Sequence, residues 1–115
     1  MGRIYRPVEL SNENESIPAV AILDTGADET VISERIAEKL NLEKDGRFEA
    51  ICASRNIITG YYASVEIELK WEEKKARMTV GVSNEPFETD DIDDEGVDVI
   101  IGMDFIQETK MDIKL

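Results

Sequence analysis

The chain has 115 residues, 42% of them apolar and 34% charged, with a formal net charge of −13 and a sequence pI near 4.3. This composition is typical of one soluble globular domain, and the excess of negative charge disfavours nucleic-acid binding because phosphates would be repelled. There is no histidine and only one cysteine, which excludes Ser-His-Asp and Cys-His catalysis, His-ligated zinc and disulfides within the chain. A hydrolase of this composition has to use carboxylates.

The sequence shows no signal for export or membrane insertion. No apolar run approaches the length of a membrane span, and the first ten residues, MGRIYRPVEL, lack the apolar segment of a secretory signal. We therefore expect a cytoplasmic protein without a membrane partner.

The first half of the chain predicts a β-hairpin followed by a helix. Apolar stretches at Ile4–Leu10 and Ile17–Leu23 flank a polar loop over residues 11–16, as in a hairpin of two strands. Apolar residues four apart then predict a helix over Ser33–Leu40, with Ser33 at its N-cap.

The second half predicts further strands around an acidic loop. Val65, Ile67, Leu69 and Trp71 alternate with charged residues, which is the period of a strand with one buried face. A turn at Glu72–Lys75 and a return strand through Met78–Val82 are predicted next, followed by an exposed acidic region, Glu85–Asp98. The chain then predicts a buried strand at Val97–Gly102 and a short helix near Asp104–Glu108. It ends in a segment with alternating apolar residues, Met111–Leu115. The chain is therefore predicted to form one mostly β domain over residues 1–115.

Two motifs carry chemical information, and the first follows the second predicted strand. It reads Asp24-Thr25-Gly26-Ala27-Asp28-Glu29-Thr30. An Asp-Thr-Gly triplet alone is an ordinary turn sequence, but this one places a carboxylate at the edge of a core, where an uncompensated charge is unfavourable. The second motif, Val99-Ile100-Ile101-Gly102-Met103-Asp104-Phe105-Ile106, joins an apolar strand to a short helix. Together, and in this order, the two motifs resemble those of the retropepsin-type aspartic proteases, the single-domain relatives of the pepsins.

The resemblance extends in element order over nearly the whole chain, and it implies an all-β, single-domain retropepsin-like barrel with one or two short helices. It also implies an aspartic endopeptidase that needs no metal or organic cofactor. Hydrolysis of an amide needs a base to activate water and an acid to protonate the leaving nitrogen, and two adjacent carboxylates that share one proton can supply both. The chain contains one Asp-Thr-Gly triplet, so the second aspartate must come from a second copy on a twofold axis. The expected partners are thus a second copy of the chain, in a homodimer, and a peptide or protein substrate.

The resemblance assigns catalytic roles to three residues of the first motif. Asp24 would form the dyad with its counterpart, Thr25 would hydrogen-bond across the axis, and Gly26 would let the backbone approach the dyad and the substrate. The apolar strand of the second motif would pack beneath this loop, with Gly102 leaving room for it.

The substrate-binding roles fall on the rest of this loop and on a β-hairpin flap. Ala27 would lie beneath the substrate, Asp28 would bind the substrate backbone, and Glu29 would lie further out. An acidic turn beside a helix is the alternative interpretation of the two acids. The flap is expected within Phe48–Leu69, and the residues at its tip are Ala53, Ser54, Arg55 and Asn56.

Two departures from the retroviral pattern leave another function open. Retroviral enzymes usually carry arginine after the glycine of the second motif, paired with the acid that is Asp28 here, but this chain has Met103. Their flaps are rich in glycine, whereas the expected flap contains only Gly60. The alternative is a retropepsin-fold module that dimerises or binds peptides with little or no catalysis. In either case the C-terminal segment Lys110–Leu115 is expected to form an interface strand.

Overall fold

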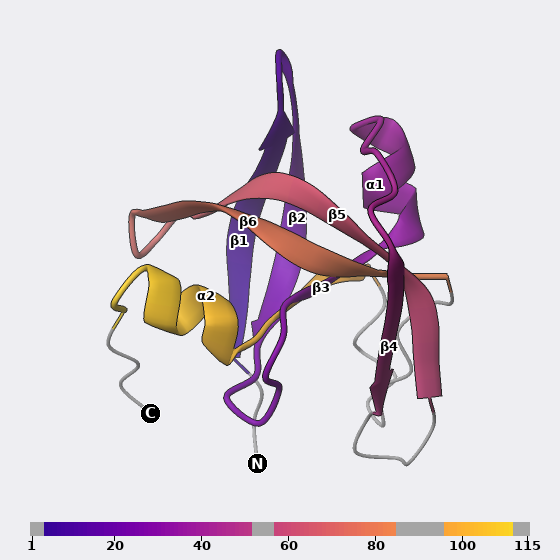
Figure 1. The fold of residues 1–115 in the computed structure, drawn as a ribbon. Coiled ribbons are helices and arrows are strands. Elements are labelled where there is room, and N and C mark those ends of the chain that lie inside the picture. The colour runs from indigo at the N-terminus through magenta and orange to yellow at the C-terminus, as the bar shows by residue number, and fades with distance from the viewer. Residues whose placement is uncertain (1–3, 52–56, 85–95, 112–115) are drawn as a thin grey trace.

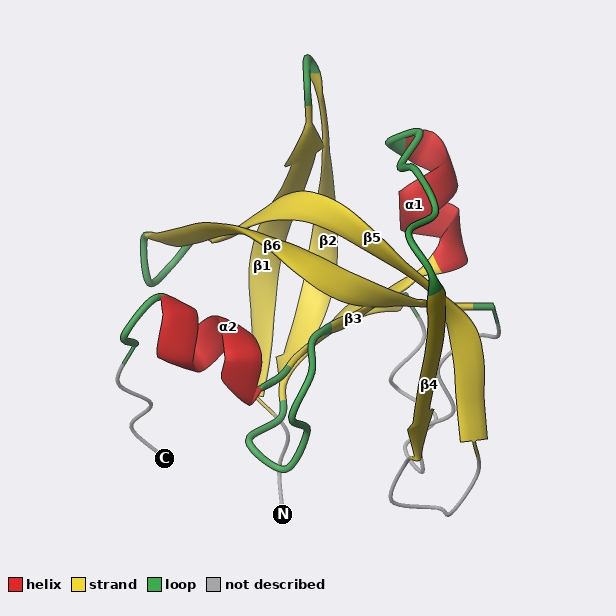
Figure 2. Ribbon diagram, in the orientation of Figure 1, coloured by secondary structure: helices red, strands yellow, loops and turns green. Residues whose placement is uncertain are grey.

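The computed structural model describes residues 4–51, 57–84 and 96–111, which form seven strands and two short helices. This content confirms the predicted all-β class with one or two short helices (Figure 2). In chain order the elements are β1 (Ile4–Asn12), β2 (Glu15–Leu23), β3 (Val31–Ser33), α1 (Glu34–Lys39), β4 (Arg47–Ile51), β5 (Ile57–Leu69), β6 (Lys74–Ser83), β7 (Val97–Ile101) and α2 (Met103–Glu108).

The strands form one sheet that closes on itself. Their order is β1-β2-β7-β3-β6-β5-β4, and β1 also pairs with β5, so that six of the strands complete a barrel while β4 extends it beside β5 (Figure 1). The pairs β2–β7 and β3–β6 are parallel, and the other described pairs are antiparallel. Closure leaves few free edges and encloses the apolar faces of the strands.

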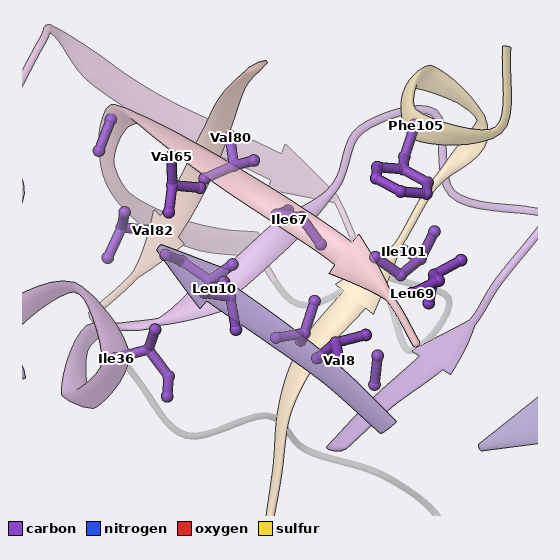
Figure 3. Packing of buried hydrophobic residues seen from close by; sticks show 14 of the residues in the cluster. Val8, Leu10, Ile36, Val65, Ile67, Leu69, Val80, Val82, Ile101 and Phe105 are labelled. Atoms are coloured by element: carbon purple, nitrogen blue, oxygen red, sulfur yellow. The ribbon is translucent and has the colours of Figure 1, made fainter. Parts of the chain in front are cut away.

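The core is built from the inward-facing residues of these strands and from both helices. Along β5, Ala63, Val65, Ile67 and Leu69 are fully buried, while the residues between them are not, as the alternation of the sequence predicts. Figure 3 shows these side chains meeting those of the neighbouring elements. The labelled core residues, each at most 1% exposed, are Val8, Leu10, Ile36, Val65, Ile67, Leu69, Val80, Val82, Ile101 and Phe105.

The predicted hairpin and first helix are confirmed, but the environment of Asp98 differs from the prediction. Ser33 stands at the N-cap of α1 without capping it, because its hydroxyl donates to Asp98 Oδ1 at 2.8 Å. Asp98 is 7% exposed, not a solvated member of the acidic region. Arg35 compensates the buried charge through an ion pair with both carboxylate oxygens, and this contact raises the pKa of the Arg35 guanidinium. Residues 85–95 lie outside the described part of the chain.

Trp71 was predicted on the buried face of its strand, and this prediction is wrong. The strand β5 ends at Leu69, which pairs with Lys74, and the turn between them includes Glu73 at a positive φ of 56°. Trp71 therefore lies in the turn, with 70% of its surface exposed. The Arg6 guanidinium lies 4.9 Å from the centroid of its ring, a cation–π contact.

The C-terminal residues also differ from the predicted alternation where the structure describes them. After α2, Lys110 adopts a positive φ of 53°, and the Met111 amide donates to the Ile106 carbonyl at 3.0 Å. Met111 thus folds back as the end of the helix, with its side chain 8% exposed, rather than beginning a strand. Residues 112–115 lie outside the described part. Neither described helix is long and apolar enough to cross a membrane.

Candidate active site

The Asp-Thr-Gly loop begins where a buried strand leaves the barrel. In β2, Ala21 and Ile22 are buried and pair in parallel with β7, and the Asp24 amide donates to the Ile101 carbonyl at 2.9 Å. The next residues turn out of the sheet, so that Asp24 is exposed, as are Thr25 and Gly26. In Figure 1 the loop between β2 and β3 lies at the lower end of the barrel, opposite the β1–β2 turn.

A tight turn fixes the direction of the Asp24 carboxylate. The Gly26 amide donates to Asp24 Oδ1 at 3.0 Å, and the Ala27 amide donates to the Asp24 carbonyl at 3.1 Å. A Cβ at position 26 would lie 3.3 Å from the same Oδ1, which is tighter than ordinary contact. Within residues 4–51, 57–84 and 96–111, no ion pair involves Asp24. Its carboxylate is therefore oriented by the backbone and open to solvent.

A contact between Thr30 and Asp104 holds the C-terminal end of this loop, just before β3. Thr30 is fully buried, and its Oγ1 donates to Asp104 Oδ1 at 2.6 Å while its amide donates to Asp104 Oδ2 at 3.0 Å. The same Oγ1 accepts a hydrogen bond from the Gly102 amide at 3.1 Å. Sequence reasoning missed this role for both residues. The available signals were a threonine adjoining a buried strand and an acid in the first turn of the second helix.

The start of α2 supports the loop through backbone hydrogen bonds. The Met103 amide donates to the Ala27 carbonyl at 2.8 Å, and the Asp104 amide donates to the Asp28 carbonyl at 3.1 Å. These are amides of the first helical turn, which have no partner inside the helix. A Cβ at Gly102 would lie 2.6 Å from the Glu29 carbonyl oxygen, so glycine is required there. This agrees with the prediction that Gly102 leaves room for the loop.

The predicted substrate-binding residues of the loop follow Asp24 within the same loop. Ala27 is half-buried, and Asp28 and Glu29 are exposed. Glu29 accepts a hydrogen bond from the Tyr62 hydroxyl, which lies 3.3 and 3.4 Å from its two carboxylate oxygens. Desolvation, followed by the charge and hydrogen bond of Glu29, raises the pKa of Tyr62. Sequence reasoning did not single out Tyr62, because nothing in the alternation of β5 marks it.

The expected flap corresponds to the hairpin of β4 and β5. These strands pair antiparallel from Arg47↔Tyr61 to Ile51↔Ile57, and in Figure 1 they project at the same lower end of the barrel as the loop after β2. The tip residues Ala53, Ser54, Arg55 and Asn56 lie outside the described residues, so their assignment stays a prediction.

The described residues contain no cluster of three or more Asp, Glu, Cys or His side chains that could hold a metal ion. The side chains at this site are the exposed carboxylate of Asp24, two further acids on the same loop and a tyrosine beside one of them.

The first motif, and all but the last residue of the second, lie within a stretch that matches a known family. A family model described as aspartyl protease matches residues 7–105, and this is most of the chain. The chain therefore belongs to the aspartyl protease family. In the comparison with curated proteins, no sequence matches significantly.

Solved structures with the same fold include viral and cellular proteins. The EIAV protease, solved in complex with the inhibitor HBY-793, is 22% identical over 99% of this chain and 94% of its own, with a TM-score of 0.61. The retroviral protease-like domain of Ddi1 from Leishmania major is 19% identical over 100% of this chain and 83% of its own, with a TM-score of 0.63. Lpg0085 from Legionella pneumophila, a protein of unknown function, is 15% identical over 95% of this chain and 89% of its own, with a TM-score of 0.54. This likeness confirms the predicted retropepsin-like fold.

Proposed function

We propose that the chain is an aspartic endopeptidase whose active site forms between two copies of the chain. The observation that carries the proposal is the Asp24 carboxylate, exposed at the end of a buried strand and held by the Gly26 amide. The loop that carries it is fixed by the buried contact of Thr30 with Asp104, so the carboxylate has a defined position. One copy supplies one such carboxylate, and a twofold axis next to the loop would bring the second one beside it.

The proposed reaction follows from two carboxylates that share a proton. Adjacent like charges disfavour a state in which both are ionised, so one Asp24 is a carboxylate and the other is a carboxylic acid. The carboxylate takes a proton from a water molecule as its oxygen attacks the peptide carbonyl carbon, and the acid donates its proton to the carbonyl oxygen. Collapse of the tetrahedral intermediate breaks the C–N bond, and the nitrogen leaves with the proton that the first Asp24 took from water. A hydroxyl of the intermediate gives its proton to the other Asp24, which restores the starting dyad. Thr25 would hold the two loops together across the axis.

The first prediction tests this role directly. Asp24→Asn preserves the shape of the side chain but removes its ability to act as a base, so kcat/KM for a peptide that the parent chain cleaves should fall on the order of 10³-fold or more. Such a peptide is found by screening a library between acid and neutral pH. Glu38→Gln, an exposed substitution on α1 with the same change in charge, is the control and should cleave like the parent.

Sedimentation should show the same dimer for the parent and for both variants. Equal turnover by Asp24→Asn and the parent would rule out the proposal. Peptide binding by a dimeric parent chain without any turnover would instead support the alternative of a binding module.

A further inference from the structure

A hydrogen bond connects the catalytic loop with the flap hairpin. Glu29 belongs to the loop that starts at Asp24, and Tyr62 belongs to β5, the strand that leads away from the flap tip. The Tyr62 hydroxyl lies at nearly equal distances, 3.3 and 3.4 Å, from the two oxygens of the Glu29 carboxylate. The two segments that would border a bound substrate are thus joined by one side-chain pair.

The position of Tyr62 is set by the core beneath it. Its ring meets the buried ring of Phe48 on β4 edge-to-face, with centroids 5.3 Å apart and planes at 82°. Phe48 in turn packs on the backbone of Gly81, where an added Cβ would lie 2.4 Å from the Phe48 ring. The Tyr62 ring is therefore positioned by packing, and its hydroxyl lies within hydrogen-bond reach of both oxygens of the exposed Glu29 carboxylate.

The charge of this carboxylate is not neutralised by the protein where the structure describes it. The ion pairs among the described residues are Arg6–Glu72, Arg35–Asp98, Lys70–Glu68 and Lys75–Glu66, and none of them includes Glu29. Met103, at the start of α2, where its amide donates to the Ala27 carbonyl of the loop, is neutral. An exposed carboxylate without an ion-pair partner favours a cationic substrate group over a neutral one. The cationic group forms a charge-assisted hydrogen bond with it, whereas a neutral group forms only an ordinary hydrogen bond.

We infer that Glu29 is a specificity-determining residue and Tyr62 its positioning residue, and that together they select peptides with a lysine or arginine side chain near the cleaved bond. This inference rests on the proposed endopeptidase function. In it, the substrate cation contacts the Glu29 carboxylate while the Tyr62 hydroxyl keeps that carboxylate facing the substrate.

The test compares matched peptides. In a peptide that the parent chain cleaves, each position near the cleaved bond carries in turn lysine or norleucine, which has the same four-carbon chain without the ammonium group. At one position the parent should prefer lysine in kcat/KM, on the order of fivefold for a partly exposed ion pair. Glu29→Gln should remove this preference. Tyr62→Phe keeps the ring contact with Phe48 and should reduce the preference, mainly by raising KM for the lysine peptide.

Two control variants separate this effect from general ones. Glu38→Gln makes the same change in net charge on α1, and Tyr61→Phe removes a hydroxyl from the residue next to Tyr62; both should retain the parent's preference. No preference in the parent at any position, or a preference that survives Glu29→Gln, would overturn the inference while leaving the endopeptidase proposal intact. If the parent cleaves no peptide, the binding of matched lysine and norleucine peptides to the parent, measured by fluorescence anisotropy, still tests the specificity separately from the activity. A lysine preference in binding, without any turnover by the parent, would overturn the proposed activity and support the specificity.

Discussion

Thr30 shows how one buried residue can hold a loop that is otherwise exposed. Its hydroxyl both donates to Asp104 and accepts from the Gly102 amide, and its carbonyl accepts from the Gly81 amide at 3.0 Å. Three segments that are distant in the sequence therefore meet at one residue, and its side chain makes two of the bonds. Because the side chain has no exposed surface, water cannot replace any bond that is lost.

Thr30→Val is predicted to destabilise the fold. The substitution keeps the shape but leaves the buried Gly102 amide without its acceptor, which should lower the free energy of unfolding by about 1–3 kcal/mol in urea denaturation. Thr79→Val, at an exposed position on β6, is the matched control and should change it by less than about 0.5 kcal/mol. Equal effects of the two substitutions would show that the buried hydroxyl contributes nothing specific.

At the scale of elements, β7 is fixed at both ends. At its C-terminal end, the Ile101 carbonyl accepts a hydrogen bond from the Asp24 amide, which ties the strand to the loop that begins at Asp24. Near its other end, Asp98 joins the strand to α1 through Ser33 and Arg35. The position of the loop thus depends on where β7 lies between β2 and β3.

Asp98→Ala should loosen this second attachment. Loss of the hydrogen bonds to a nearly buried carboxylate is expected to lower the free energy of unfolding by about 2 kcal/mol. The Arg35 side chain is 51% exposed, so its coupling to Asp98 in a double-mutant cycle with Arg35→Met should be only about 1 kcal/mol. A coupling of zero would mean that the ion pair does not join β7 to α1.

The elements were predictable where a local pattern decides them. The alternation of β5 and the apolar run of β7 specify strands whatever surrounds them, and the two motifs place the loop between β2 and β3 and the start of α2. Trp71 was misplaced because the alternation continues in the sequence beyond the point where the chain turns. Asp98 was misplaced because its partner Arg35 is 63 residues away in the sequence.

The exposed acids of the candidate site were predictable from the sequence, but the contacts that position them were not. The motif identified the exposed acids of the loop, but the contacts that position them join residues far apart in the sequence. Thr30 and Asp104 are 74 residues apart, and Glu29 and Tyr62 are 33 apart. Such pairs follow from the closure of the barrel and have no local signature.

At the scale of the whole molecule, the proposed active site is incomplete in one chain. The single Asp-Thr-Gly triplet provides one carboxylate, and the proposed mechanism requires a base and an acid at the same time. Two copies together carry twice the net charge of −13, so association has to overcome repulsion that salt screens. The central claim is therefore that Asp24 acts as a pair.

Mixing the parent chain with the Asp24→Asn chain tests this claim most directly. After subunits exchange in an equal mixture, about one quarter of the dimers contain two intact Asp24 residues, whereas half of the chains do. Peptidase activity per total chain should thus fall to about one quarter of that of the parent, and mixing with Glu38→Gln should cause no fall. Activity that remains at about one half, in proportion to the fraction of parent chains, would show that each chain acts alone and would contradict the account.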